Sequence, residues 1–294
     1  MKKVLSLAMA LAMCLTMTAC GGGNNNSTQD NTGGNVSQSN PGGSSDGSGG
    51  GADASQPVGG SDTEYVKNKG TLVVGITEFE PMDYKNADGE WIGFDADMAG
   101  VFAKSLGVTA EFQIIDWDNK VMELDGKTID VVWNGMTLTD DVIAAMETSN
   151  PYFVNAQVVV VKADKADQYQ TVESLADLSF AVESGSAGKE QADENGFTYT
   201  EVADQATALM EVASGTSDAA IIDISMAKAM IGEGTSYADL TYTVSLNEEE
   251  YGVGFRKGSD LAAALNDFFK SSYADGSMQT IAGSYGIEGN LIEQ

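Results

Sequence analysis

The alternation of short apolar runs with amphipathic helical periods is the feature that most constrains how this chain folds. It begins at Thr71 and continues almost to the C-terminus. Such alternation is typical of α/β domains, in which helices cover the faces of a sheet. Two successive series of roughly 100 residues each predict two lobes. Strands are predicted at residues 71–76, 111–115, 129–133, 157–161, 179–182, 198–202, 219–222 and 252–256.

Apolar residues at helical spacing predict three of the helices between these strands. Asp95 is predicted to cap the first helix, and Gly107 to end it. A last short helix is expected over residues 278–285. The predicted buried faces are Met98, Val101, Phe102 and Leu106 in the first helix, Ala206, Leu209, Met210 and Ala213 in the second, and Leu261, Leu265, Phe268 and Phe269 in the third.

The N-terminus has the pattern of a secretion signal with a lipid attachment site. Lys2 and Lys3 precede an apolar run that ends near Met17, which is too short to cross a bilayer. The stretch from Met17 to Cys20 resembles a bacterial lipobox, so residues 1–19 are expected to be removed and Cys20 to carry the lipid. Cleavage after an ordinary signal peptide, with Cys20 incidental, is the alternative.

A Gly-, Ser- and Asn-rich segment follows this cysteine. Residues 21–60 contain 13 glycines and no aromatic residue. Such a composition cannot bury enough apolar surface to fold. Residues 20–63 are therefore predicted to be a disordered tether that holds the folded part outside the cytoplasm, near the cell membrane.

Composition excludes several classes of function. The chain has no histidine, which rules out Ser-His-Asp and Cys-His catalysis. Cys14 leaves with the signal and Cys20 would be lipidated, so no thiol is left for a disulfide or a metal. The formal charge of −29, or −31 once Lys2 and Lys3 are removed, excludes a basic nucleic-acid footprint. We expect no enzymatic activity, no metal and no cofactor.

Two loops of small polar residues are candidate ligand sites. Residues 134–139 follow a predicted strand and precede a helix near Asp140, and residues 183–188 do the same in the second series. In open α/β sheets, ligands bind beyond the carboxyl ends of the strands. Backbone N–H groups at a helix N-terminus favour a carboxylate there. One such loop alone is an ordinary strand-to-helix turn.

The order and spacing of these motifs resemble the family-3 solute-binding proteins of bacterial ABC importers, the amino-acid-binding group of the periplasmic-binding-protein fold. The resemblance covers nearly all of residues 68–287. It is carried by Gly70-Thr71-Leu72-Val73-Val74-Gly75, Gly93-Phe94-Asp95-Ala96-Asp97-Met98, Asp116-Trp117-Asp118, Ile129-Asp130-Val131, Gly135-Met136-Thr137-Leu138-Thr139, Ser149-Asn150-Pro151-Tyr152, Val182-Glu183-Ser184-Gly185-Ser186, Asp218-Ala219-Ala220-Ile221-Ile222-Asp223 and Tyr251-Gly252-Val253-Gly254-Phe255-Arg256-Lys257-Gly258.

The resemblance implies a bilobal α/β fold of type II whose two lobes close on a ligand by a hinge motion. Lobe 1 would comprise residues 64–154 plus 251–294, and lobe 2 residues 155–250. Two extended crossovers would join them near residues 154–160 and 245–254.

Position by position, the resemblance also implies a ligand site. Phe79 and Trp117 would be its aromatic walls, with core packing as the alternative. Gly135, Thr137 and Ser186 would hold the ligand carboxylate. Asp223 would accept the α-ammonium group, with a solvated carboxylate at a strand end as the alternative.

Two departures bear on the ligand. The family usually places an arginine three residues after the second threonine of its Gly-Met-Thr-x-Thr motif, where this chain has Val142. The only arginine, Arg256, matches a strand position outside the cleft. Glu183 stands where some relatives carry a lysine or a neutral residue. A site short of positive charge and rich in carboxylates favours a cationic or neutral polar ligand, with glutamate and aspartate least favoured.

We therefore expect a monomeric, lipid-anchored binding protein that delivers a small amino acid or amine to an ABC permease driven by a separate ATPase. One alternative is a lyase or dehydratase on the same fold, with Glu183 as general acid. Another is a tethered sensor that passes its closed form to a receptor.

Overall fold

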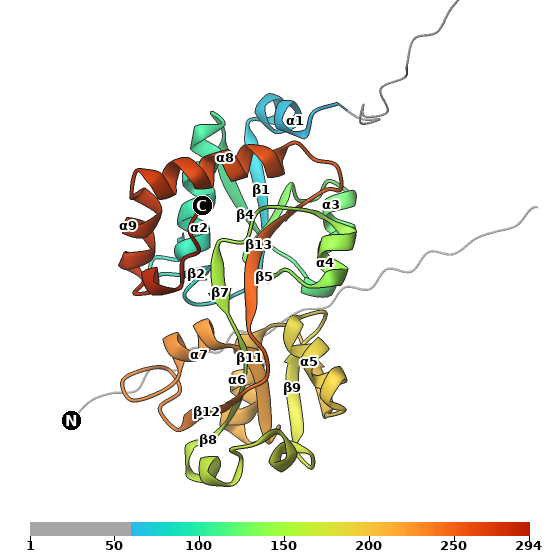
Figure 1. Ribbon diagram of the computed structural model, residues 1–294, viewed down its shortest axis with the longest axis vertical. Coiled ribbons are helices and arrows are strands. Elements are labelled where there is room, and N and C mark those ends of the chain that lie inside the picture. Colours follow the sequence, from blue (N-terminus) through green and yellow to red (C-terminus); the bar gives the residue numbers. More distant parts are fainter. Residues whose placement is uncertain (1–59) are drawn as a thin grey trace, which may run out of the picture. The chain divides into compact units, whose positions relative to one another are not determined.

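Two β-sheets organise the part of the chain that the computed structural model describes, residues 60–294 (Figure 1). The predicted signal peptide, Cys20 and nearly all of the predicted tether lie outside this range. Between residues 60 and 294, no helix is long and apolar enough to cross a membrane.

The first sheet has the strand order β4-β1-β5-β13-β6, with β7 also paired to β13. Strands β1, β4 and β5 are parallel, so their carboxyl ends meet at one edge, and β13 runs antiparallel to β5. The strands are β1 (Thr71–Ile76), β4 (Thr109–Ile114), β5 (Val131–Thr137), β6 (Glu147–Thr148), β7 (Phe153–Asn155) and β13 (Glu249–Phe255). A separate hairpin pairs β2 (Tyr84–Lys85) with β3 (Trp91–Ile92).

The second sheet has the order β10-β9-β11-β8-β12. Its strands β9, β10 and β11 are parallel to one another, whereas β8 is antiparallel to both of its neighbours, β11 and β12. The strands are β8 (Gln157–Lys162), β9 (Ser179–Glu183), β10 (Thr198–Val202), β11 (Ala219–Asp223) and β12 (Leu240–Ser245). All eight strands predicted from the sequence are therefore present, with shifts of a few residues at their ends.

Helices pack on both sheets. The first sheet carries α1 (Asp62–Lys69), α2 (Phe94–Ser105), α3 (Lys120–Asp125), α4 (Asp140–Ala145), α8 (Leu261–Ala274) and α9 (Ser277–Ser284). The second carries α5 (Ala187–Asn195), α6 (Gln205–Ser214) and α7 (Ile224–Met230). Short 3-10 turns occupy Trp117–Asn119, Ala163–Gln168, Val172–Leu175 and Glu288–Asn290. We call the first sheet with its helices the first lobe and the second sheet with its helices the second lobe.

The core of the first lobe is aromatic. The Trp133 indole on β5 lies 6.2 Å from the Phe102 ring on α2 and 5.6 Å from the Phe269 ring on α8, measured between ring centroids. All three side chains are fully buried. Burying such large side chains typically contributes about 1.5–3 kcal/mol each, so these contacts hold the two helices against the sheet.

The chain passes between the lobes twice. It leaves the first sheet at Asn155 and enters the second at Gln157, and it returns between Ser245 and Glu249. Glu249 and Glu250 pair with β7, so the first sheet begins two residues before the lobe boundary predicted at Tyr251. Both crossovers run side by side in Figure 1.

One helix turns a different face to the core than the sequence predicts, and a second differs from the prediction at one residue. In α6 the buried residues are Gln205, Ala208, Leu209 and Val212, whereas Met210 is 54% exposed. In α2, Met98 and Phe102 are buried as expected, but Val101 is 43% exposed. The buried stripe of α6 follows the i, i+4 pair of Ala208 and Val212, so the predicted stripe was wrong by about one residue.

Asp95 does not cap α2. The helix begins at Phe94, and Gly93 precedes it without a side-chain cap. The Asp95 carboxylate turns into the core, where it accepts hydrogen bonds from the Tyr152 hydroxyl at 2.7 Å and from the amide of Gly135 at 2.6 Å. Because these two donors already satisfy the buried Asp95 carboxylate, it makes no capping hydrogen bond to the first turn of α2.

Candidate ligand-binding site

A cavity of about 410 Å³ lies between the two lobes. All seven residues predicted to bind ligand line it: Phe79, Trp117, Gly135, Thr137, Glu183, Ser186 and Asp223. The first four come from the first lobe, and the last three from the ends of β9 and β11 and the start of α5 in the second lobe. Its volume falls in the range of small-molecule sites.

Phe79 and Trp117 face the cavity and also pack in the core. Phe79 is 3% exposed and meets the Tyr251 ring edge-on, with centroids 6.3 Å apart. Trp117 is 6% exposed and belongs to an apolar cluster with Leu124 and Ile129. Both aromatic side chains therefore belong to the cavity wall and to the core at the same time, and their contact with a bound ligand stays a prediction.

Gly135 is required by the close approach of Phe79. Its φ is +55°, and a Cβ atom built on it would lie 2.5 Å from Phe79 Cε1. Its amide N–H is already donated to Asp95. This glycine therefore has no free N–H for the ligand carboxylate, and the carboxylate contact predicted for it is not available through its amide.

The predicted loop at residues 134–139 is largely strand. β5 continues to Thr137 because the Asn134 side chain accepts the amide of Thr77 at 2.9 Å and donates to Asp83 at 2.8 Å inside the first lobe. The predicted helix does begin at Asp140, and the Thr139 hydroxyl caps it by accepting the amide of Val142 at 3.3 Å. The Thr137 hydroxyl donates to Glu249 Oε1 at 2.9 Å, a contact within the crossover.

Ser186 caps α5 as its loop predicts. Its Oγ accepts the amide of Lys189 at 3.2 Å, and residues of the first turn of α5 line the cavity. The first backbone N–H groups of a helix have no partner within the helix. This end of the cavity therefore offers the amide of Ala187 and the Ser186 hydroxyl donor to an anionic group.

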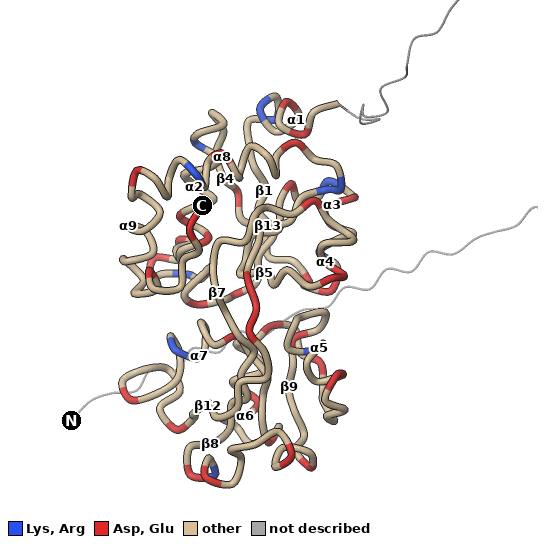
Figure 2. Tube along the Cα trace, viewed as in Figure 1, with Lys and Arg blue, Asp and Glu red and all other residues tan. Residues whose placement is uncertain are grey.

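Acidic residues dominate the charge of the cavity wall. Six carboxylates line it against two lysines, Lys120 and Lys189: Asp118, Asp141, Glu183, Glu190, Asp193 and Asp223. Figure 2 shows further acidic residues on the crossover into β13. No arginine lines the cavity, and Val142 does. The wall therefore repels anionic side chains and attracts cations.

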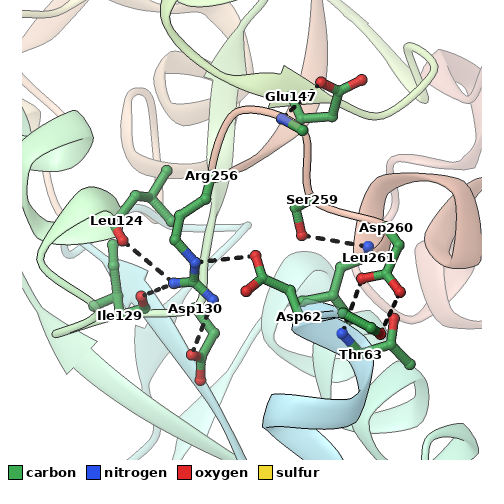
Figure 3. A network of polar contacts seen from close by, with 12 residues as sticks. Asp62, Thr63, Leu124, Ile129, Asp130, Glu147, Arg256, Ser259, Asp260 and Leu261 are labelled. Carbon is green, nitrogen blue, oxygen red and sulfur yellow. Dashed lines mark hydrogen bonds and ion pairs between the residues drawn. The ribbon is translucent and has the colours of Figure 1, made fainter. Parts of the chain in front are cut away.

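Arg256 is engaged elsewhere, as the sequence predicted (Figure 3). Its Nε atom lies 3.0 Å from the Asp62 carboxylate on α1. Its Nη1 donates to the carbonyls of Ile129 and Leu124, and its Nη2 lies 3.6 Å from the Asp130 carboxylate. This arginine therefore anchors α1 to the first sheet and cannot serve as a ligand clamp.

Lys120 crosses the cavity from one lobe to the other. Its Nζ donates to the carbonyl of Gly185 in the second lobe at 2.9 Å and to that of Trp117 at 3.2 Å. Burial lowers the pKa of this amine, while nearby Glu183 opposes the change. Its position three residues after Trp117, one helical turn on, is the signal that places both side chains on the same side.

Glu183 is a buried carboxylate with an unpartnered oxygen. The residue is 3% exposed, and its Oε1 has no hydrogen-bond partner among the described residues. Burial raises its pKa to about 8, with Asp223 and Asp204 adding to the shift and Lys120 and Gln205 opposing it. A ligand group that donates hydrogen bonds would fill this position.

Asp223 is the other buried carboxylate of the second lobe, and four side chains donate to it. They are Asn155, Gln157 at 3.1 Å, Gln205 and Tyr251 at 2.6 Å. Burial and, as the second cause, the charge of Glu249 together raise the pKa of Asp223 to about 8. Gln205 and Glu249 were not predicted, because only the tertiary fold brings them to Asp223.

Comparison with known proteins identifies the family. Residues 72–288 match the bacterial extracellular solute-binding proteins, family 3. The chain therefore belongs to this family of extracytoplasmic binding proteins. This result confirms the resemblance noted in the sequence.

Individual relatives bind amino acids. The L-cystine-binding protein TcyJ of Escherichia coli is 29% identical over 221 residues, which cover 74% of this chain and 83% of that protein. The arginine-binding extracellular protein ArtP of Bacillus subtilis is 29% identical over 222 residues, covering 72% and 85%.

A solved structure confirms the bilobal fold class. The ancestral amino-acid-binding protein AncCDT-1, a precursor of cyclohexadienyl dehydratase, superposes with a TM-score of 0.70 at 30% identity. The alignment covers 76% of this chain and 99% of that one.

Proposed function

We propose that this protein captures an amino acid or amine with a positively charged side chain and delivers it to an ABC importer. The observation that carries the proposal is Glu183, whose buried Oε1 lines the cavity without a partner. A guanidinium or ammonium group supplies the missing donor. The arginine-binding name of the relative ArtP supports this ligand class.

The gain from this contact can be estimated. A hydrogen bond to a charged group contributes about 1.5–3 kcal/mol, which corresponds to roughly 10- to 150-fold in affinity. Because Glu183 is 3% exposed, water does not compete well for its carboxylate. An acidic side chain at the same place would keep the Glu183 carboxyl protonated and would gain no charged hydrogen bond from it.

The rest of the ligand is assigned to the two lobes as follows. Asp223 accepts the α-ammonium group, and Phe79 and Trp117 flank the ligand. Ser186 and the first amide of α5 receive the carboxylate, in place of the arginine that Val142 replaces. Closure of the lobes about the crossovers then presents the loaded form to a permease and its ATPase.

We also propose that the mature protein is a monomer held at the membrane by lipid on Cys20. The stretch from Met17 to Cys20 and the composition of the following residues support this anchor. Metabolic labelling with a fatty-acid analogue tests it. Label that persists in a Cys20→Ser variant would show that the anchor is elsewhere.

Calorimetric titration of the purified protein with L-arginine, L-lysine, putrescine, L-glutamine and L-glutamate tests the ligand class. We expect a cationic compound to bind tightest, and L-glutamate as the tightest binder would contradict the proposal. In the Glu183→Gln variant, affinity for L-arginine should fall roughly 10- to 150-fold, while affinity for L-glutamine changes far less.

The Glu190→Gln variant is the matched control. Glu190 also lines the cavity, but its side chain is exposed. The same chemical change there should lower L-arginine affinity by less than about fivefold, since exposed charges contribute little. Equal losses in both variants would mean that overall charge, and not Glu183, sets the preference.

A lyase is the second candidate function, favoured by one observation. The raised pKa of Glu183, about 8, keeps this carboxyl protonated at neutral pH, as a general acid requires. The relative AncCDT-1, named as the precursor of a dehydratase, has the same fold. Incubation with prephenate, followed by proton NMR, tests turnover. Release of product that stops in Glu183→Gln would favour the enzyme.

A further inference from the structure

Glu249 lies beside Asp223 at the junction of the two lobes. The Nε2 atom of Gln157 is 3.1 Å from Asp223 Oδ1 and 2.8 Å from Glu249 Oε1. The side-chain amide of Asn155 likewise donates to both carboxylates. Two amide groups therefore bridge two acidic side chains, one at the end of β11 and one on the second crossover.

All the other contacts of the two carboxylates are neutral donors. Glu249 also accepts from the Thr137 hydroxyl at 2.9 Å and from the Asn247 amide at 3.0 Å. Asp223 also accepts from the Tyr251 hydroxyl and the Gln205 amide. Within residues 60–294, no ion pair joins either carboxylate to a lysine or arginine.

Two neighbouring carboxylates without a cation cannot both keep their charge at low cost. The remaining charged or titratable groups around Asp223 do not supply a counter-charge. Glu183 and Asp204 are acidic, the Tyr251 hydroxyl is neutral because burial raises its pKa, and Lys120 is held by the carbonyls of Trp117 and Gly185. In the empty site, a proton is the available positive charge.

We propose that Glu249 is a positioning residue of the ammonium site: its nearby carboxylate keeps a proton on Asp223 when the site is empty, and Asp223 releases this proton when an ammonium group binds. The proposal rests on the proposed function, since it needs an ammonium-bearing ligand at Asp223. In the exchange, the O–H bond breaks, the proton passes to solvent and an N–H of the ligand takes its place. No other bond changes.

This exchange makes binding depend on pH. The pKa of Asp223 is raised to about 8, first by burial and then by Glu249. Below that value the ligand must displace a proton, so affinity rises with pH by up to about tenfold per unit and levels off above it. Binding can also displace a proton from Glu183. The contribution of Glu249 is therefore measured as the difference in released protons between the wild-type protein and the Glu249→Gln variant.

Calorimetric titration with L-arginine at pH 7, in two buffers of different ionisation enthalpy, counts the released protons. The wild-type protein should release about one proton or more per L-arginine. The Glu249→Gln variant should still bind L-arginine but release at least about half a proton fewer, since Asp223 then ionises more readily.

Glu250→Gln is the matched control, because the neighbouring side chain is exposed and makes no hydrogen bond through its carboxylate among the described residues. It should release as many protons as the wild type. Equal release by both variants would overturn the proposal. So would L-arginine binding to the wild type with no proton released, a result that does not depend on any variant folding.

A ligand-free measurement separates this proposal from the proposed function. Carbon-13 NMR of aspartate-labelled protein should show a carboxyl signal with a midpoint near pH 8 that moves to lower pH in Glu249→Gln and not in Glu250→Gln. If L-arginine gives no binding heat but this signal behaves as expected, the proposed ligand class fails while the role of Glu249 in keeping a proton on Asp223 stands. If no such signal is found, that role is refuted.

Discussion

Closure of the two lobes depends on a glycine at their contact. Gly185 in the second lobe lies against Asp118 in the first, and a Cβ atom at Gly185 would be 2.7 Å from Asp118 Cα. The neighbour is backbone, so it cannot rotate away. A Gly185→Ala substitution therefore obstructs the closed form specifically, because opening of the lobes relieves the contact.

The size of the effect follows from two contributions. Gly185 has a φ of +68°, which costs an alanine about 1–2 kcal/mol whether the lobes are open or closed. The contact with Asp118 adds an overpacking cost of about 1–3 kcal/mol in the closed form alone. That second cost converts to roughly a 5- to 150-fold loss of ligand affinity.

Gly196→Ala isolates the first contribution. Gly196 ends α5 with a φ of +69°, and nothing lies within 4 Å of its Cβ position. Both variants should lose roughly 2–8 °C in the unfolding temperature of the ligand-free protein. Only Gly185→Ala should lose affinity for L-arginine in calorimetry. Equal affinity of the two variants would show that the bound form does not bring Gly185 against Asp118.

Three further perturbations test other contacts. Lys120→Met removes the hydrogen bond to the Gly185 carbonyl. L-arginine affinity should therefore fall about 2- to 10-fold, and small-angle X-ray scattering should show a larger radius of gyration in the ligand-free state. An unchanged radius would contradict the cross-cavity role. Because the pKa of Glu183 is about 8 in the folded protein and near 4 when unfolded, the folded state holds a proton that the unfolded state has lost between these values. The unfolding temperature should therefore fall from pH 5 to pH 8.5, and a slope no flatter in Glu183→Gln would contradict the cause. Arg256→Met leaves Asp62 and the carbonyls of Leu124 and Ile129 without their arginine donor and should cost about 3–5 kcal/mol in urea unfolding. A loss below about 1 kcal/mol would show that the anchor contributes little.

Local patterns were enough to predict eight of the eleven strands in the two sheets, whereas β6, β7 and β12 were missed. Apolar β-branched runs such as residues 157–161 mark buried strands directly, because both faces of these strands are covered. The continuation of β5 through Asn134 could not be predicted in this way. Its polar side chain is satisfied by Thr77 and Asp83, which are far away in the sequence.

The site was predictable in part for a related reason. Residues at strand ends and helix starts, such as Ser186 and Asp223, follow from the topology of an α/β fold and from the resemblance to a family. Glu249 could not be predicted, because a glutamate in an exposed-looking Glu-Glu-Glu run gives no sign that its carboxylate meets Asp223. The hydrogen-bond partner of the Gly135 amide could not be predicted either, because it is the buried carboxylate of Asp95, which is far away in the sequence.

The attachment of α1 has a mechanical consequence. Asp62 is bonded to Arg256, and Ser61 and Thr63 are bonded to Asp260 at the start of α8, so the chain enters the folded part through the first lobe (Figure 3). A pull on the preceding chain is transmitted to the first sheet and bypasses the crossovers. In the proposed closure, the second lobe would therefore carry no load, and the first lobe would be the fixed part.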